Sequence, residues 1–242
     1  MSAYTESPRY RRCQAIFDRT YPNFRDAGQR YADRIAAALT EETRLLDVGC
    51  GRTSLAADVM QQAQARIGID LSFSDLQHNT SMHAVAMADA AHLPFPDAHF
   101  DLLVSQWVVE HFVEPEAAFT EMARVLRPDG RLVLLTTNAN NYIPLVSRLV
   151  PDGLQRFMIE KLLRRPSHES FPTTYRANTR RAIQRIASRT GFEVESLEFV
   201  GNPFYMAFNV LAFRVAMLYE RMTDWRPLNG FKLYIVATLR RI

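Results

Sequence analysis

The sequence predicts an α/β protein built on a doubly wound, mostly parallel sheet with helices on both faces. Short apolar segments of strand length alternate with segments of helical periodicity over most of the chain. Those short segments are apolar throughout, as strands covered on both faces are. Polar residues stand where four successive segments end, and ligands of such sheets bind at that edge.

Composition limits the class of protein. The chain has 242 residues, 48% of them hydrophobic, which is enough for one domain with a sizeable core. Its two cysteines, Cys13 and Cys50, cannot build a disulfide framework, so we expect a reducing, cytoplasmic setting. Residues 1–14 lack the apolar core of a signal peptide, and no run approaches the roughly 20 apolar residues of a membrane span.

Charge is distributed unevenly along the chain. The formal net charge is +3. Residues 1–140 carry 13 Lys and Arg against 18 Asp and Glu, whereas residues 141–242 carry 16 against 8, a balance of +8. A basic second part favours an acceptor that is lipid-linked or associated with a membrane.

The elements of the first part follow from periodicity and from helix-breaking residues. Spaced apolar residues predict one or two helices at 9–39, broken near Pro22. Thr53 or Ser54 is expected to cap the helix that follows the first strand. The predicted elements after 9–39 are a strand at 44–50, a helix at 53–64, a strand at 65–72, a helix at 73–82 and a third strand that gives way to a loop within 84–97.

The second part keeps this alternation as far as residue 138. A fourth strand running into a helix is predicted within 99–112, and a helix at 114–126 is stopped by the turn signal RPDG. Prolines with aromatic and basic residues then indicate an insertion of short helices. The other predicted elements are a strand at 131–138, a helix capped by Thr179 and ended by Gly191, a strand at 193–201, a helix at 203–222 and a strand at 231–241.

The stretch LLDVGCGRTS raises the question of a ligand. Gly49 and Gly51 allow close approach of the backbone, and Asp47 would repel a phosphate but suits an amine. Asp70, at the end of the next strand, can accept hydrogen bonds from two ribose hydroxyls. Asp89, at the third strand end, can accept from an adenine amino group. S-adenosylmethionine combines a carboxylate, an amine, a ribose and an adenine.

The motifs LLDVGCG, IGIDLS, ADAAHLPFPDAHFDLLVSQWVVEHF and EMARVLRPDGRLVL resemble the successive motifs of class I S-adenosylmethionine-dependent methyltransferases. The similarity is greatest to the small-molecule branch, which includes quinone-biosynthesis methyltransferases, and covers residues 40–138. It implies a Rossmann-like sheet of seven strands with an antiparallel last strand, and S-adenosylmethionine as cofactor. The predicted cofactor-binding residues are Asp47, Gly49, Gly51, Asp70, Leu71, Asp89, Ala90, Ser105 and Gln106.

One departure from the family pattern concerns Thr53, which stands where the family usually has a third glycine. Its Cβ could narrow the methionine end, but we expect cofactor binding to survive. A nicotinamide dehydrogenase is less compatible, because its fingerprint requires glycine at the position of Ser54.

The resemblance also implies a division of one methyltransferase domain, residues 1–242. Its expected parts are an N-terminal helical cover at 1–40, a cofactor-binding core at 41–140, a substrate-side insertion at 141–178, and C-terminal helices with a closing hairpin at 179–242. His111 is the candidate general base, and a packing role is its alternative. The candidate substrate residues are Arg25, His168, Tyr175 and Arg176, and no metal site is expected.

The function these residues predict is methyl transfer to a small-molecule or lipid- or glycan-linked acceptor, at oxygen. Carbon is an alternative target and would depend on aromatic residues such as Trp107 and Tyr142. An RNA or protein methyltransferase is a second alternative, served by Arg181, Arg185 and Arg189 on one helix face. A non-catalytic binding module is a third. DNA is not expected as a partner, and RNA is the less favoured one.

The apolar helix at 203–222 has two interpretations. Burial against the sheet accounts for most of its apolar residues. Alternatively, the helix forms a homodimer face, a pocket for an apolar acceptor or a shallow contact with the inner face of a membrane.

Overall fold

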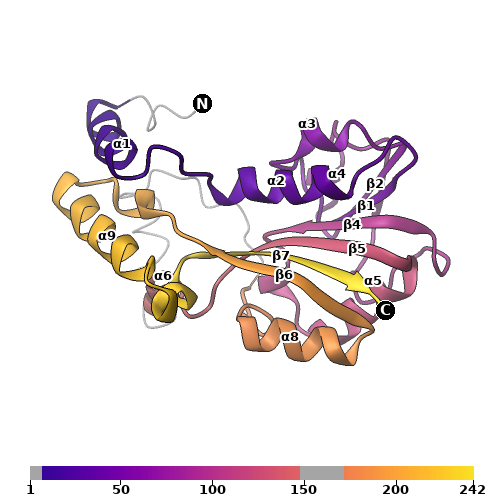
Figure 1. The fold of residues 1–242 in the computed structure, drawn as a ribbon. Helices are drawn as coiled ribbons and strands as arrows, with labels where there is room; N and C mark the ends of the chain where they lie inside the picture. Colours follow the sequence, from indigo (N-terminus) through magenta and orange to yellow (C-terminus); the bar gives the residue numbers. More distant parts are fainter. Residues whose placement is uncertain (1–6, 148–171) are drawn as a thin grey trace. The chain divides into compact units, whose positions relative to one another are not determined.

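The computed structural model describes residues 7–147 and 172–242, which form a seven-stranded sheet with strand order β3-β2-β1-β4-β5-β7-β6 (Figure 1). The strands are β1 (Arg44–Val48), β2 (Ala65–Asp70), β3 (Ala84–Met87), β4 (Phe100–Gln106), β5 (Leu126–Thr137), β6 (Phe192–Val200) and β7 (Tyr234–Arg241). The described α-helices are α1 (Pro8–Thr20), α2 (Ala27–Ala38), α3 (Ala57–Met60), α4 (Phe73–Leu76), α5 (Pro115–Val125), α6 (Tyr142–Ser147), α8 (Arg180–Arg189) and α9 (Val210–Thr223). Short 3₁₀ helices are η1 (Val109–His111), η2 (Pro203–Met206) and η3 (Arg226–Phe231).

The chain divides into two compact units. The sheet unit consists of Ala27–Thr137, Pro172–Glu198 and Ile235–Ile242. The helical unit consists of Met1–Asp26, Asn138–Phe171 and Phe199–Tyr234.

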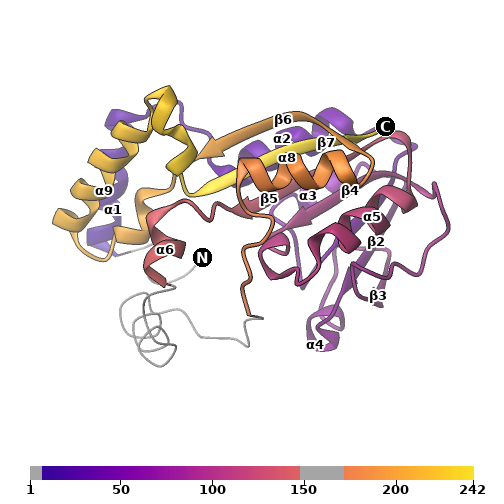
Figure 2. The same ribbon diagram turned by 90° about the horizontal axis from the view of Figure 1, so that it is seen from below.

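The sheet confirms the predicted fold class. Strands β1 to β5 pair in parallel, and β7 is antiparallel to both β5 and β6. Leu46 of β1 stands in register with Ile67 of β2 and Leu103 of β4, and most residues of β1 and β4 are buried. Helix α2 covers one face, while α5 and α8 cover the other, as the two views show (Figures 1 and 2). Apolar residues on both faces of β1 and β4 therefore lie in the core.

The predicted helix at 53–64 is much shorter than expected, because α3 has only four residues. Neither Thr53 nor Ser54 caps it. The N-cap is Ala56, without a side-chain capping bond. The guanidinium of Arg66 donates to the backbone oxygens of Gln61 and Ala63, and this takes carbonyl groups that a longer helix would use.

The predicted helix at 73–82 is likewise reduced to the single turn of α4. Ser72 caps it by accepting a hydrogen bond from the backbone N–H of Asp75. Beyond the turn, the side-chain oxygen of Asn79 accepts from the backbone N–H groups of Ser81 and Met82, at 2.9 and 3.1 Å. Such side-chain bonds compete with helix continuation and end α4 early.

Two further boundaries differ from the prediction. RPDG is not a free turn between elements, since β5 already begins at Leu126. Between the paired residues Phe100–Leu126 and Leu102–Arg131, β5 advances by five residues while β4 advances by two. The motif therefore lies at a register shift between these two strands. The predicted helix at 203–222 is divided into η2 and α9. Asn209 divides it by accepting from the backbone N–H groups of Leu211 and Ala212 as an N-cap.

Other boundaries agree with the prediction. The helices α1 and α2 are separated at the segment that holds Pro22. Thr179 caps α8 by accepting from the backbone N–H of Ala182 at 3.1 Å, and Gly191 follows its end with a φ of 81°. No helix within the described ranges is long and apolar enough to cross a bilayer.

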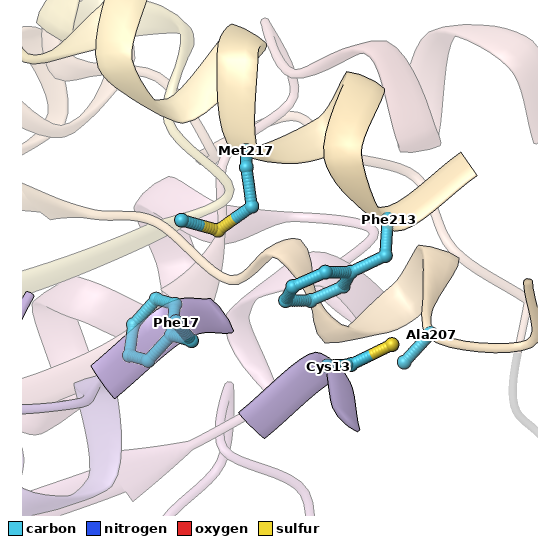
Figure 3. Close-up of a cluster of buried hydrophobic side chains, with 5 residues drawn as sticks. All are labelled: Cys13, Phe17, Ala207, Phe213 and Met217. Atoms are coloured by element: carbon cyan, nitrogen blue, oxygen red, sulfur yellow. The ribbon is translucent and has the colours of Figure 1, made fainter. Parts of the chain in front are cut away.

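The helical unit has its own apolar core between α1 and α9. Figure 3 shows its five buried side chains, Cys13, Phe17, Ala207, Phe213 and Met217. The ring of Phe204 packs on both Phe17 and Phe213, with ring centroids 5.1 and 5.2 Å apart. The apolar residues of α1 and of the inner face of α9 therefore hold these two helices together.

We expect Phe213→Ala to lower the free energy of unfolding by about 3–5 kcal/mol, because it removes a fully buried ring and leaves a cavity. The control is Leu211→Ala on the same helix, where the side chain is 71% exposed and the expected change is within about 0.5 kcal/mol. Urea denaturation followed by circular dichroism measures both. Equal effects of the two substitutions would show that the cluster does not stabilise α9.

Candidate functional site

The glycine turn after β1 is fixed to the end of β2. Gly49 and Gly51 have φ angles of 78° and 47°, in the left-handed region that favours glycine. The backbone N–H groups of Gly49 and Cys50 both donate to the carbonyl oxygen of Ile69, at 2.8 and 2.9 Å. The N–H of Gly51 donates to Oδ2 of Asp70 at 2.9 Å. The turn and the end of β2 thus form one hydrogen-bonded element.

Asp70 is held on both carboxylate oxygens. Its Oδ1 accepts from the backbone N–H of Ser72 at 2.8 Å, while Oδ2 accepts from Gly51. Each carboxylate oxygen can accept a second hydrogen bond, so a ligand can still bind there. The neighbouring side chain of Leu71 is exposed.

Asp47 is a buried carboxylic acid next to this turn. Burial, and then the charge of Asp70, raises the pKa of Asp47 to about 7. No described residue forms an ion pair with Asp47. Burial also raises the pKa of Tyr31 on α2, and the charge of Asp47 adds to that shift. The Tyr31 hydroxyl makes no hydrogen bond of normal geometry within the described chain, although the Ser105 backbone lies close enough to oppose the shift.

The ends of β3 and β4 complete the same edge, because the strand order places β3, β2, β1 and β4 side by side. Asp89 is exposed and accepts from the backbone N–H of Ala91, while Ala90 is buried. The buried hydroxyl of Ser105 donates to the carbonyl oxygen of Val48 at 3.0 Å. The side-chain oxygen of Gln106 accepts from the backbone N–H of Leu55 at 2.9 Å. All four predicted strand ends therefore lie at one edge.

Trp107 directly follows β4 and has a φ of 54°. Left-handed backbone is uncommon for a bulky residue and is found preferentially at functional sites. Its backbone N–H donates to the carbonyl oxygen of Leu135 at 2.8 Å, which anchors the residue to β5.

Sequence reasoning did not assign a role to Glu110, which is buried beside these strand ends. Its Oε2 accepts from the hydroxyl of Thr136 at 2.7 Å, and its Oε1 accepts from that of Thr137 at 3.3 Å. Asn178 in turn donates to the Thr136 hydroxyl at 2.6 Å. Burial raises the pKa of Glu110, and the hydrogen bond from Thr136 opposes that shift. The signal in the sequence at this position is the dipeptide EH directly after the predicted fourth strand.

The main chain of Glu110 also holds a segment far away in sequence. Its carbonyl oxygen accepts from the backbone N–H groups of Thr174 and Tyr175, at 2.7 and 3.1 Å. Arg176 donates to the carbonyl oxygen of Val113 at 2.7 Å, and Nδ1 of His111 lies 3.1 Å from the carbonyl oxygen of Pro172. The structure therefore holds the segment of Tyr175 and Arg176 against η1, which contains His111.

Because a carbonyl oxygen can only accept, we assign the proton of a neutral His111 ring to Nδ1, which leaves the lone pair on Nε2.

The other two predicted substrate residues lie outside this part of the sheet unit. Arg25 is exposed and belongs to the helical unit, and His168 lies outside the described residues. Within the described ranges, no cluster of three or more His, Cys, Asp or Glu side chains is arranged to hold a metal ion.

Residues 46–134 match the family model described as a methyltransferase domain. A phosphatidylethanolamine N-methyltransferase of Cereibacter sphaeroides is 31% identical over 59% of this chain and 72% of its own length. A fatty-acid O-methyltransferase of Mycolicibacterium smegmatis is 28% identical over 56% of this chain and 52% of its own length. A mitochondrial arginine hydroxylase of Danio rerio is 32% identical over 43% of this chain. The chain spans only 34% of the length of that hydroxylase.

Among solved structures, a geranyl diphosphate C-methyltransferase from Streptomyces coelicolor, in complex with S-adenosyl-L-homocysteine, shares the fold with a TM-score of 0.57. It is 15% identical in sequence, and the match covers 87% of this chain and 76% of the other. At this identity the likeness concerns the fold, and function must be argued from the site.

We expect Thr136→Val to lower the free energy of unfolding by about 2–3 kcal/mol, because it removes the hydroxyl between two buried groups, Glu110 and Asn178. Hydrogen exchange at the N–H groups of Thr174 and Tyr175 should become faster, since both donate to Glu110. The control is Thr120→Val on α5, whose exposed hydroxyl bonds only within its own helix. Unchanged exchange in Thr136→Val would mean that the network does not hold this segment.

Proposed function

The chain belongs to the class I S-adenosylmethionine-dependent methyltransferases, and from this membership we propose that it methylates a small, largely apolar or lipid-type acceptor at oxygen. The observation that carries the proposal is the edge formed by the ends of β1 and β2. There a glycine turn is flanked by the fixed carboxylate of Asp70 and the buried carboxyl group of Asp47.

The chemistry of Asp47 fits the amino acid end of S-adenosylmethionine. A buried carboxyl group with a pKa of about 7 gains most from a positive charge brought next to it. The ammonium group of the cofactor provides that charge. The buried hydroxyl of Tyr31 supports the same assignment, because it is a polar group that a ligand could satisfy.

The remaining assignments follow the strand order. We assign the ribose hydroxyls to Asp70 and Leu71, and the adenine to Asp89 and Ala90. Gln106 and Ser105 complete the methionine end together with Gly49 and Gly51. Thr53 is exposed, and its hydroxyl lies 3.4 Å from the hydroxyl of Ser81. This position of the side chain supports cofactor binding without a third glycine.

The cofactor supplies an electrophilic methyl group on a positively charged sulfur. What this chain must add is the position of the acceptor and a place for its proton. In our proposal, Nε2 of His111 takes the proton of the acceptor hydroxyl as the oxygen attacks, since Nδ1 is held by Pro172. Glu110 keeps the segment of Tyr175 and Arg176 beside His111 through its backbone oxygen. Those two residues are our candidates for contact with the acceptor, and the role of Arg25 stays a prediction from the sequence.

The named functions of the relatives bear on the class of acceptor. The likeness to lipid methyltransferases supports an apolar acceptor. An RNA substrate is less supported, because Arg189 of the α8 face already pairs with Glu116 at 2.9 Å. Both cysteines are free and buried, which supports the proposal of a cytoplasmic protein.

Calorimetric titration with S-adenosylmethionine and S-adenosyl-L-homocysteine tests the proposal. We expect micromolar binding by the wild type and at least about a tenfold loss in Asp70→Ala, because two ribose hydrogen bonds are worth at least about 1.4 kcal/mol. Asp58→Ala, an exposed carboxylate on α3, is the control. Methyl transfer is then measured with fatty acids, hydroxylated apolar compounds and phosphatidylethanolamine. Absence of cofactor binding by the wild type would contradict the proposal.

The affinity for S-adenosylmethionine should increase with pH up to about pH 7. An ammonium group next to Asp47 lowers the pKa of the bound carboxyl group, so binding releases a proton below pH 7. The cofactor amine stays protonated over this range, since α-amino groups titrate at about 7.7–8.0. We expect Kd to fall by up to about tenfold per pH unit between pH 5.5 and 7. Asp47→Asn should remove this dependence, and a flat wild-type profile would refute the assignment of Asp47.

A further inference from the structure

Helix α9 carries apolar residues on two opposite faces. Its inner face holds Phe213 and Met217 in the core of the helical unit. Its outer row consists of four residues. They follow one another at intervals of four, three and four positions, and this spacing places all four on one line along the helix. These are Leu211, Val215, Leu218 and Met222, with exposed fractions of 71%, 62%, 60% and 52%. The solvent side of a surface helix is normally polar, so this row requires an explanation.

Basic and aromatic side chains accompany this outer row. Arg214 and Arg221 are exposed, and their seven-residue spacing places both along one flank of it. Just beyond the helix, Trp225 is 66% exposed, and Arg226 is exposed next to it. Tryptophan and arginine beside an apolar row are typical of helices that lie in a membrane interface.

The helical unit that contains this row has a net positive charge. Its described residues include nine Lys and Arg against four Asp and Glu, a formal balance of +5. Glu220 and Asp224 are engaged by Lys232, at 3.4 and 2.8 Å, and Asp224 also accepts from Tyr21. Within the described chain, by contrast, no ion pair involves Arg214, Arg221 or Arg226.

We propose that the outer row of α9 docks the protein on a membrane surface that contains anionic lipids. The apolar row inserts at the level of the acyl chains, and the arginines contact the lipid phosphates. A second copy of the chain is the less favourable occupant, because a symmetric pair would place arginines near arginines around the same row. The inference rests on the proposed function in one respect, since a membrane would present a lipid-type acceptor to the enzyme.

Vesicle binding tests the apolar row. Co-sedimentation is measured without cofactor, on phosphatidylcholine vesicles with and without phosphatidylglycerol. We expect the wild type to bind the anionic vesicles and Leu218→Glu to bind them at least about tenfold more weakly, because a charge in the row opposes insertion. Ile242→Glu is the matched control, since Ile242 is 71% exposed and belongs to the sheet unit. This control should bind as the wild type does.

A second pair of variants tests the charge. Arg214→Gln with Arg221→Gln should weaken binding to anionic vesicles by about 25-fold, at roughly fivefold for each arginine near the surface. Arg181→Gln with Arg185→Gln removes the same charge from exposed positions of α8 and should leave binding unchanged. Added salt should weaken wild-type binding.

Three outcomes would overturn the proposal. The first is that the wild type does not bind anionic vesicles. The second is that Leu218→Glu and Ile242→Glu bind them equally. The third is that the wild type is a dimer, which Leu218→Glu converts to a monomer without any change in vesicle binding. Sedimentation velocity decides the last of these. Calorimetry with S-adenosylmethionine separates this test from the proposed function, because Leu218→Glu should bind the cofactor as the wild type does.

Discussion

The hydrogen bond from the backbone of Gly51 to the carboxylate of Asp70 is the interaction on which the rest of the site depends. It joins the turn after β1 to the end of β2, and the left-handed backbone of Gly51 is what makes that donor available. Parallel pairing alone aligns the strands but leaves the loops at their ends without a fixed shape. Because Ser72 occupies the other oxygen of Asp70, the carboxylate has one orientation before any ligand arrives. Such preorganisation reduces the entropy lost on binding.

The carboxyl group of Asp47 lies at the same edge, but it is buried, and burial raises its pKa. Its burial among apolar strands and the nearby charge of Asp70 disfavour the ionised form, so the group is partly protonated near neutral pH. A solvent-exposed aspartate would bind an ammonium group weakly, since water screens the pair. A buried one interacts strongly, provided that a cation arrives to compensate it. The raised pKa therefore fits the proposed role of Asp47, in which the cationic cofactor provides the compensating charge.

The sequence predicts this edge well because each strand end is encoded locally, by an apolar run that stops at a polar residue or a glycine. The short helices were not predictable in the same way. Just beyond the end of helix α3, Arg66 bonds the carbonyl groups of Gln61 and Ala63. The side chain of Asn79, after α4, also donates to the carbonyl oxygen of Gly51 in the glycine turn. The Glu110 network is equally non-local, since its partner Thr136 lies on β5 and Asn178 precedes α8. Periodicity contains no information about such tertiary bonds.

The two units differ in charge, as the two parts of the sequence do. The sheet unit, with Asp47 and Asp70, has 15 Lys and Arg against 18 Asp and Glu, whereas the helical unit has 14 against 8. The acidic balance belongs to the unit whose strand edge suits a cationic cofactor, and the basic balance belongs to the unit that carries the exposed row of α9. The negative balance of the sheet unit suits the cationic cofactor, and the positive balance of the helical unit suits the anionic membrane surface proposed above. An acceptor with an anionic or lipid-type headgroup would be attracted to the helical unit, while the cofactor amine would be attracted to the sheet edge.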